Sequence, residues 1–399
     1  PAELERARNA VMPGSSHRRA AIAFDIDGVF KYGREWAEAG LSSLRKASEA
    51  KIPYVFVTNG GGGLTEKVYG AHLKEKVLAA GGGSSGDIEL PSAERMILSY
   101  TPWETQLVPG LVDKRVLLVG DPADKVRDVA ATYGLKHAVH YSDYARAHPS
   151  INPFALARES GTSHTAVANT TVVKTAAQPA SKENAEEPFA AILVMCDPYE
   201  WYEALQISID VLCSPTPLSL EFDPNAAPMP IHFSNPDFLS KFEHPFPRFA
   251  QGAFKVALMA LYKARLRALR VPEEGISERI GSSLRQWGKP TPGTYRFVEE
   301  RLRSLAPDDG APVTAETQWC FYMVGDNPTS DMEGVRRANI HHMGSTTQWR
   351  GVLVRTGVYK EGDETNGAHV VVDGIEQAVE WILEQESGAQ PPPAKKPRA

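Results

Sequence analysis

Two aspartates close an apolar run near the start of the chain, in the segment FDIDGVF. Asp25 and Asp27 are two residues apart, so in an extended strand their side chains would point to the same side. Two carboxylates this close repel one another unless a cation lies between them or one is protonated. This favours a division of labour in which one carboxylate is a metal-binding nucleophile and the other exchanges a proton, and an ordinary Asp-Gly turn after a strand is the plain alternative for this segment alone. A carboxylate can carry a phosphoryl group covalently, which splits one difficult displacement into two easier ones.

Two further segments carry groups that suit phosphate. The segment VTNGGGG places Thr58, Asn59 and Gly60 at the end of an apolar run, where hydroxyl, amide and backbone N–H donors can hold phosphate oxygens. The segment GKP places Lys289, a compact positive charge, beside a proline. A flexible loop is the plain alternative for the first segment alone, and single lysines are common on surfaces.

A second acidic pair follows the apolar run in MVGDNPTSD. Asp326 comes directly after the run, and Asp331 lies five residues further on, across a turn with Asn327 and Pro328. Mg²⁺ favours one or two carboxylates together with waters and phosphate oxygens. An acidic turn is the plain alternative for this segment alone, whereas together with Asp25 the pair predicts a magnesium site.

Short apolar runs alternate with helix-length spacers along the chain. This pattern predicts βαβ units and a parallel sheet with both faces covered. Ligands of such open sheets bind beyond the carboxyl ends of the strands, where the polar segments above are found. The apolar runs are residues 21–24, 54–57, 116–120, 191–196 and 321–326, with helical patterns expected at 35–50 and from about 64.

The four chemical segments, in this order, resemble the four signature motifs of the haloacid dehalogenase (HAD) superfamily. The large gap between the second and third motifs resembles the C2-capped group, subfamily IIA, which includes the NagD-type and pyridoxal-phosphate phosphatases. The segments VTNGGG, FSNPD, RFAQGAF and GDNPTSD resemble a mostly mitochondrial branch named after the cat eye syndrome critical region. The resemblance spans about residues 20–385.

The resemblance implies an aspartyl-phosphate mechanism. Asp25 would attack phosphorus and ligate Mg²⁺. Asp27 would protonate the leaving oxygen and then activate water, and its backbone carbonyl would also meet the metal. Thr58, Asn59 and Gly60 would hold the phosphoryl group.

The remaining motif residues complete this expected site. Lys289 would neutralise the phosphoryl group, Asp326 would complete the Mg²⁺ shell, and Asp331 would bind the ion or orient its waters. Asn235 and Asp237, in FSNPD, either meet the leaving group or form a turn that joins cap to core.

The expected fold class is α/β: a Rossmann-like HAD core with a parallel sheet and an inserted α/β cap of C2 type. The core is expected at residues 1–107 and 246–386, and the cap at 108–245. Composition predicts a flexible insertion at 156–187 and a disordered tail at 387–399.

Charge and hydropathy narrow the range of partners. A net charge of −6 argues against nucleic acid, and no apolar run reaches the roughly 20 residues that span a bilayer. Residues 1–20 contain arginines and no lysine, which is compatible with the end of a mitochondrial presequence, and a cytoplasmic location is the alternative.

The function that the resemblance implies is Mg²⁺-dependent hydrolysis of a small phosphorylated metabolite, with a glycerol phosphate or another lipid precursor as one candidate. A homodimer is left open. Three alternatives remain at this point: a phospho-accepting receiver module, a non-catalytic scaffold, and another HAD chemistry such as a phosphomutase or dehalogenase. The intact pair Asp25 and Asp27 favours hydrolysis.

Overall fold

A computed structural model describes residues 18–83, 88–152, 186–219, 222–240, 244, 246–307 and 317–387. The chain divides into two compact units. The first holds the described residues up to Thr58, Gly70–Ile97 and those from Lys289 onward; the second holds Asn59–Tyr69 and Leu98–Gly288. Each unit has a parallel sheet of its own, so the expected α/β class is confirmed.

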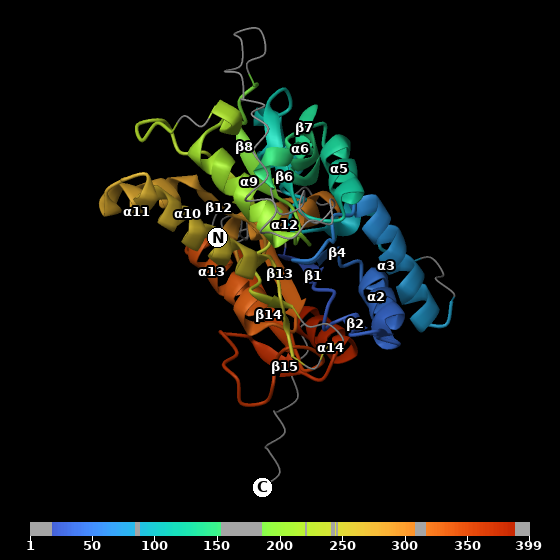
Figure 1. Ribbon diagram of the computed structural model, residues 1–399. Coiled ribbons are helices and arrows are strands. Elements are labelled where there is room, and N and C mark those ends of the chain that lie inside the picture. Colours follow the sequence, from blue (N-terminus) through green and yellow to red (C-terminus); the bar gives the residue numbers. More distant parts are fainter. Residues whose placement is uncertain are drawn as a thin grey trace, which may run out of the picture. The chain divides into compact units, whose positions relative to one another are not determined.

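The sheet of the first unit joins the beginning and the end of the chain. Six parallel strands lie in the order β15-β14-β13-β1-β4-β5, and β1 pairs with β13 from Arg18↔Gln318 to Phe24↔Val324. In Figure 1, blue strands from the start of the chain therefore lie beside orange and red strands from its end. The strands are β1(Arg18–Phe24), β4(Tyr54–Val57), β5(Met96–Ile97), β13(Gln318–Gly325), β14(Thr347–Val354) and β15(Val370–Val372).

Helices cover both faces of this sheet because both faces of its strands are apolar. Ala21 and Ala23 belong to the core that includes apolar side chains of α12 and α13, whereas the alternate residue Phe24 contacts Phe56 by its ring. On that second face α2 contacts α14. The elements around the sheet are α2(Ala39–Glu49), α3(Glu66–Ala80), η1(Ala93–Arg95), α12(Pro292–Ser304), η6(Pro328–Met332), α13(Glu333–His341), α14(Ile375–Glu386) and the hairpin β2(Lys31–Tyr32)–β3(Glu35–Trp36).

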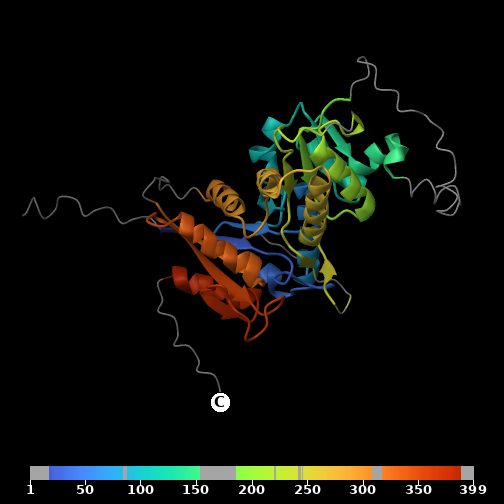
Figure 2. The ribbon, with the colours of Figure 1, turned by 60° about the vertical axis from the view of Figure 1, so that its left-hand side comes forward.

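The second unit is a five-stranded parallel sheet in the order β12-β9-β8-β6-β7, with helices packed against it. The long helix α10, gold in Figure 2, packs against α9. Its strands are β6(Arg115–Val119), β7(His137–His140), β8(Ala191–Val194), β9(Ile231–Phe233), β12(Leu284–Gln286) and the hairpin β10(Leu239–Ser240)–β11(Arg248–Phe249). Its helices are α4(Trp103–Gln106), η2(Val108–Gly110), α5(Ala123–Thr132), α6(Tyr141–Ala147), η3(Pro149–Ile151), α9(Trp201–Cys213), η5(Pro217–Ser219), α10(Gln251–Ala268) and α11(Glu273–Ser283).

Each of the five expected apolar runs overlaps a strand, namely β1, β4, β6, β8 or β13, and only the run at 54–57 has the bounds of its strand. The helix expected at 35–50 begins only at Ala39, because Glu35–Trp36 pairs with Lys31–Tyr32 as a short hairpin. The structure also groups residues 246–288 with the second unit, whereas the expected core began again at 246. The reason is that β12 pairs with β9 and α10 packs on α9.

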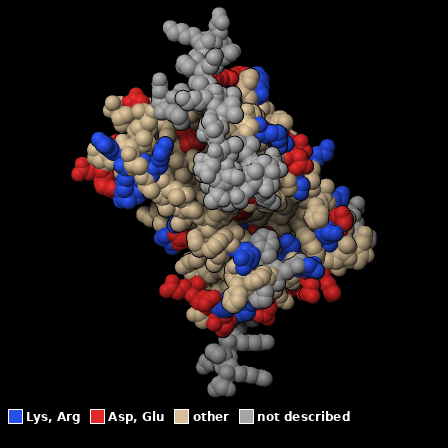
Figure 3. Space-filling model, in the orientation of Figure 1, with Lys and Arg blue, Asp and Glu red and all other residues tan. Residues whose placement is uncertain are grey.

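Several sequence-based expectations fall outside the described residues. They concern nearly all of the 156–187 insertion, the tail after residue 387, and the presequence-like residues before Arg18. Within the described part, no helix is long and apolar enough to cross a membrane. On the face shown in Figure 3, basic and acidic side chains of described residues are interspersed.

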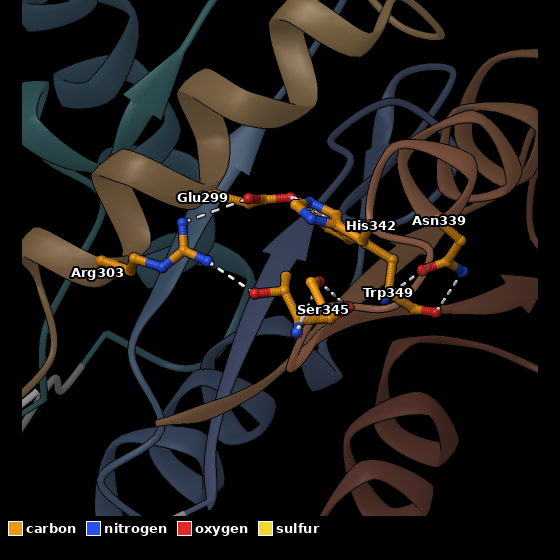
Figure 4. A network of polar contacts seen from close by, with 7 residues as sticks. Glu299, Arg303, Asn339, His342, Ser345 and Trp349 are labelled. Carbon is orange, nitrogen blue, oxygen red and sulfur yellow. Dashed lines mark hydrogen bonds and ion pairs between the residues drawn. The ribbon is translucent and has the colours of Figure 1, made fainter. Parts of the chain in front are cut away.

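A buried carboxylate ties α12 to the elements that follow it. Glu299 is 3% exposed and accepts hydrogen bonds from the indole Nε1 of Trp349 at 2.6 Å and the imidazole Nε2 of His342 at 2.7 Å. Arg303 forms an ion pair with the Glu299 carboxylate at 3.3 Å. Asn339 accepts the backbone N–H of Trp349 through Oδ1 and donates from Nδ2 to the carbonyl oxygen of Trp349 (Figure 4). Since α12 follows shortly after Lys289, this network holds in place the helix that begins next to a candidate site residue.

We expect Glu299→Ala to lower the free energy of unfolding by about 3 kcal/mol. The substitution leaves the buried Trp349 indole N–H without its acceptor and removes the carboxylate that forms an ion pair with Arg303. Glu300→Ala is the matched control, because Glu300 is exposed on the same helix. Urea unfolding measures both variants, and equal midpoints would contradict the assigned role of the network.

Candidate active site

Asp25 lies directly after β1, where the central strand of the first unit ends. Its backbone N–H donates to the carbonyl oxygen of Val324 at 2.8 Å, which continues the pairing with β13. Its Oδ1 accepts from the backbone N–H of Ile26 at 2.8 Å and lies 2.8 Å from the Nζ of Lys289. Because the residue is only 7% exposed, these contacts fix the carboxylate in a nearly dry site.

Lys289 bridges two of the predicted site carboxylates. Its Nζ lies 2.8 Å from Asp25 and 2.7 Å from Asp331, and the residue is 2% exposed. Burial by itself would lower the pKa of Lys289, but the charges of Asp25 and Asp331 outweigh it and raise the pKa. The lysine is therefore a permanent cation between two acids.

The predicted second acidic pair comes from the end of β13 and the turn after it. Asp326 accepts from the backbone N–H of Val358 at 2.6 Å, and Asp331 accepts from that of Asn327 at 3.1 Å. The π-helical turn Pro328–Met332 brings Asp331 back toward the strand end. Both acids are buried, at 4% and 0% exposure.

Glycines make room for the Asp326 carboxylate on two sides. A Cβ added at Gly28 would lie 2.3 Å from its Cγ, and one at Gly357 would lie 1.8 Å from its Oδ2. Gly28 also has a φ of +84°, which disfavours other residues. Only glycine fits at these two positions with Asp326 where it is.

The donor set fits a hard divalent cation. Asp25, Asp326 and Asp331 each offer a carboxylate oxygen, and these oxygens all lie within 4.8 Å of one another. Burial, followed by the charge of Asp331, raises the pKa of Asp326 to about 7, and burial raises the pKa of Asp25 well above its usual range. Lys289 offsets one of three negative charges, so a further cation would favour the ionised form of all three acids.

Asp27 occupies a different environment from Asp25. The strand ends at Phe24, and Asp27 lies in the tight turn that follows, so the alternation expected of an extended strand does not reach it. Its side chain is 60% exposed and pairs with Lys31 at 3.3 Å. The structure thus brings together four of the predicted residues, namely Asp25, Lys289, Asp326 and Asp331, and leaves the Asp27 side chain outside that cluster.

Thr58 directly follows β4, a strand of the first unit's sheet, and is 3% exposed. Its backbone N–H donates to the carbonyl oxygen of Ile97 at 3.0 Å. Asn59 and Gly60 come next in the chain and belong to the second unit, in which Asn59 is buried and Gly60 exposed. Tyr100 supports this loop by donating to the carbonyl oxygen of Leu64 at 2.6 Å.

The predicted residues of FSNPD lie together with Asn59 in the second unit. Asn59 donates from Nδ2 to Oδ1 of Asp237 at 3.1 Å, and Asn235 accepts the backbone N–H of Asp237 at 2.8 Å. Gln251 in turn accepts the backbone N–H of Asn235 at 2.7 Å. Sequence reasoning did not assign Gln251 a role, although its segment RFAQGAF was part of the observed resemblance.

A six-stranded parallel sheet with a buried carboxylate cluster at its strand ends defines the class of the first unit: an α/β protein with a candidate site for a divalent cation. Family models agree with this class. A haloacid dehalogenase-like hydrolase model matches residues 22–136, and a HAD-hydrolase-like model matches residues 286–378.

The chain is 30% identical over 397 residues to a mitochondrial hydrolase of Saccharomyces cerevisiae, covering 93% of this chain and 97% of that protein. The chain belongs to the haloacid dehalogenase-like hydrolases.

The chain is also 27% identical to a fusion of cardiolipin synthase (CMP-forming) with a mitochondrial hydrolase in Schizosaccharomyces pombe. That match covers 91% of this chain and spans about half of the fusion protein (53%).

Among solved structures, a 4-nitrophenylphosphatase of Thermotoga maritima matches with a TM-score of 0.53 and 16% identity, over 91% of this chain and 97% of that one. At this identity the likeness shows the fold. A structure described as a putative nagD protein shares the fold in the same way, with a TM-score of 0.55 and 16% identity, over 91% of this chain and 98% of that one. Membership of a hydrolase family counts against a receiver module, which was one alternative.

We expect the metal-free protein to lose stability relative to an Asp326→Asn variant as pH rises. The pKa of Asp326 is raised in the fold from its ordinary 3.8 to about 7. Its contribution is therefore fully present below about pH 4 and lost as pH rises through about 7. Unfolding of both proteins in chelator, from about pH 4 to about pH 8, measures the difference, and a difference independent of pH would contradict this account.

Proposed function

We propose that the protein is a Mg²⁺-dependent phosphohydrolase that acts on a small phosphorylated metabolite through an aspartyl-phosphate intermediate. The observation that carries the proposal is the buried cluster in which Lys289 joins Asp25 to Asp331, with the three carboxylates within 4.8 Å of one another. A structural ion pair would need one acid for one lysine. Three acids around one lysine instead suit a site that holds a metal and a phosphoryl group.

In the proposed reaction, a carboxylate oxygen of Asp25 attacks phosphorus, and the ester P–O bond breaks as the new P–O bond forms. Asp27 gives a proton to the leaving oxygen. It then takes a proton from the water that attacks the aspartyl-phosphate, which releases inorganic phosphate and restores Asp25. This role requires Asp27 to exchange its contact with Lys31 for the leaving group.

Other residues act on the charge of the phosphoryl group. Lys289 offsets negative charge at the reacting centre, and Thr58 with Asn59 and Gly60 binds the phosphoryl oxygens. A bound Mg²⁺, held by Asp25, Asp326 and Asp331 together with the Asp27 carbonyl, would supply further neutralisation and orientation.

The relatives support a narrower substrate class and a location. One is named a mitochondrial hydrolase, and another is named as a fusion of cardiolipin synthase with a mitochondrial hydrolase. We therefore place this protein in mitochondria and its substrate among phosphorylated lipid precursors such as a glycerol phosphate. This step rests on the relatives and not on residues of the site.

We expect Asp25→Asn to lower phosphate release by roughly a thousandfold or more, because an amide is a poor nucleophile and a poor metal ligand. Release is measured with p-nitrophenyl phosphate and with a panel of glycerol and sugar phosphates. Asp373→Asn is the matched control, since Asp373 is an exposed acid of the same unit. The nucleophile assignment fails if Asp25→Asn keeps more than about a tenth of the wild-type rate.

Removal of divalent cations should abolish activity, and Mg²⁺ should restore it. Three buried carboxylates repel one another, and burial together with that repulsion raises the pKa values of Asp25 and Asp326. Ca²⁺ should substitute poorly, because its looser coordination does not hold the in-line geometry. Phosphate release is assayed after exhaustive chelation and after titration with each ion, and full activity in chelator would contradict the metal requirement.

A further inference from the structure

A chain of buried hydrogen bonds begins at Gln251, the first residue of α10. Gln251 has no exposed surface; its Oε1 accepts the backbone N–H of Asn235 at 2.7 Å, and its Nε2 donates to Oγ of Ser234 at 3.1 Å. Ser234 donates to the carbonyl oxygen of Met195, beyond the end of β8, at 2.7 Å. Because a backbone N–H can only donate, the orientation of the Gln251 amide is determined.

The chain continues through FSNPD to Asn59. Oδ1 of Asn235 accepts the backbone N–H of Asp237 at 2.8 Å, and Oδ1 of Asp237 accepts from Nδ2 of Asn59 at 3.1 Å. The carbonyl oxygen of Asp237 also accepts the backbone N–H of Gly252 at 2.8 Å. A Cβ at Gly252 would lie 2.4 Å from the carbonyl oxygen of Pro236, so this turn rests directly against the start of α10.

The Asn59 amide is confined on a second side. A Cβ at Gly288 would lie 2.8 Å from Oδ1 of Asn59 and 2.6 Å from the carbonyl oxygen of Ser234. One end of the amide therefore faces Asp237, and the other faces the residue directly before Lys289. Asn59 follows Thr58 directly in the chain.

We propose that Asp237 and Gln251 are positioning residues that hold Asn59 for the phosphoryl group, so that Asp237 serves every substrate alike and does not select the leaving group. This inference rests on the proposed phosphohydrolase function. It differs from the leaving-group contact, one of the two roles expected for Asp237, because one of its carboxylate oxygens is directed to Asn59 in the structure. A residue that orients a phosphate-binding amide changes binding of the part that all phosphate esters share.

The test compares Asp237→Ala with Asp237→Asn. The asparagine retains an oxygen that can accept from Asn59 Nδ2, whereas alanine removes it. We expect Asp237→Ala to raise KM for every phosphate ester, and the dissociation constant of inorganic phosphate, by the same factor of about ten. Asp237→Asn should restore both constants to near wild-type values, and Asp128→Ala, at an exposed acid of the same unit, should leave both unchanged.

A double-mutant cycle tests the link to Asn59. If Asp237 acts through Asn59, then Asp237→Ala should add little in an Asn59→Ala background. Gln251→Met, which keeps the volume but removes the hydrogen bonds, should raise the phosphate dissociation constant by a smaller factor. Thermal unfolding of each variant shows whether the fold is retained.

Each other outcome overturns the proposal. A changed ranking of esters with unchanged phosphate binding would assign Asp237 to the leaving group. Additive effects in the cycle, or wild-type constants for Asp237→Ala, would remove its link to Asn59. Binding of inorganic phosphate with Mg²⁺, measured by calorimetry, does not need turnover. Wild-type protein that binds phosphate yet hydrolyses no ester would therefore refute the proposed function alone, whereas protein that does not bind phosphate would refute both.

Discussion

The first unit is organised around a buried excess of negative charge. Three carboxylates lie at the ends of β1 and β13 and in the turn after β13, and the ammonium of Lys289, from the segment before α12, contacts two of them; each of the four residues is less than a tenth exposed. Burying ionised groups is costly unless they are paired, and one lysine cannot pair with three acids. The arrangement persists because backbone N–H groups of Ile26, Val358 and Asn327 bind the carboxylates. The position of the Asp326 carboxylate also explains why glycine is needed at positions 28 and 357.

Strand pairing and the packing of α12 hold these charged residues in place. β1 and β13 are paired along seven residues, which sets Asp25 beside the end of β13. Tyr295 of α12 donates to the carbonyl oxygen of Asp331 at 2.7 Å, and Glu299, one turn further on, ties the same helix to Trp349 of β14. Apolar strands thus place the acids, and a buried hydrogen bond from α12 supports the turn after β13.

The second unit contains a chain of hydrogen-bonded side chains that is mostly uncharged. Its chain of amide and hydroxyl contacts is neutral except for Asp237, and it ends at Asn59, whose chain neighbour Thr58 belongs to the first unit. Such a chain is satisfied at each link, which makes it rigid and makes the loss of one member costly. The family membership gives the class of enzyme, while the substrate depends on groups that the family does not share.

The sequence by itself determined the strands, the order of the motifs and the identity of four clustered residues. Runs such as YVFV and FYMVG are apolar over the length of a buried strand, and acids after them must lie at a sheet edge. Only the tertiary structure decided the separate environments of Asp25 and Asp27, because the strand ends one residue before Asp25 and the turn directs the two side chains differently. It also decided that Gln251 reaches FSNPD and that Asp237 holds Asn59. Contacts between residues 16 and 178 positions apart in the chain leave no periodic or compositional signal, since folding alone brings them together.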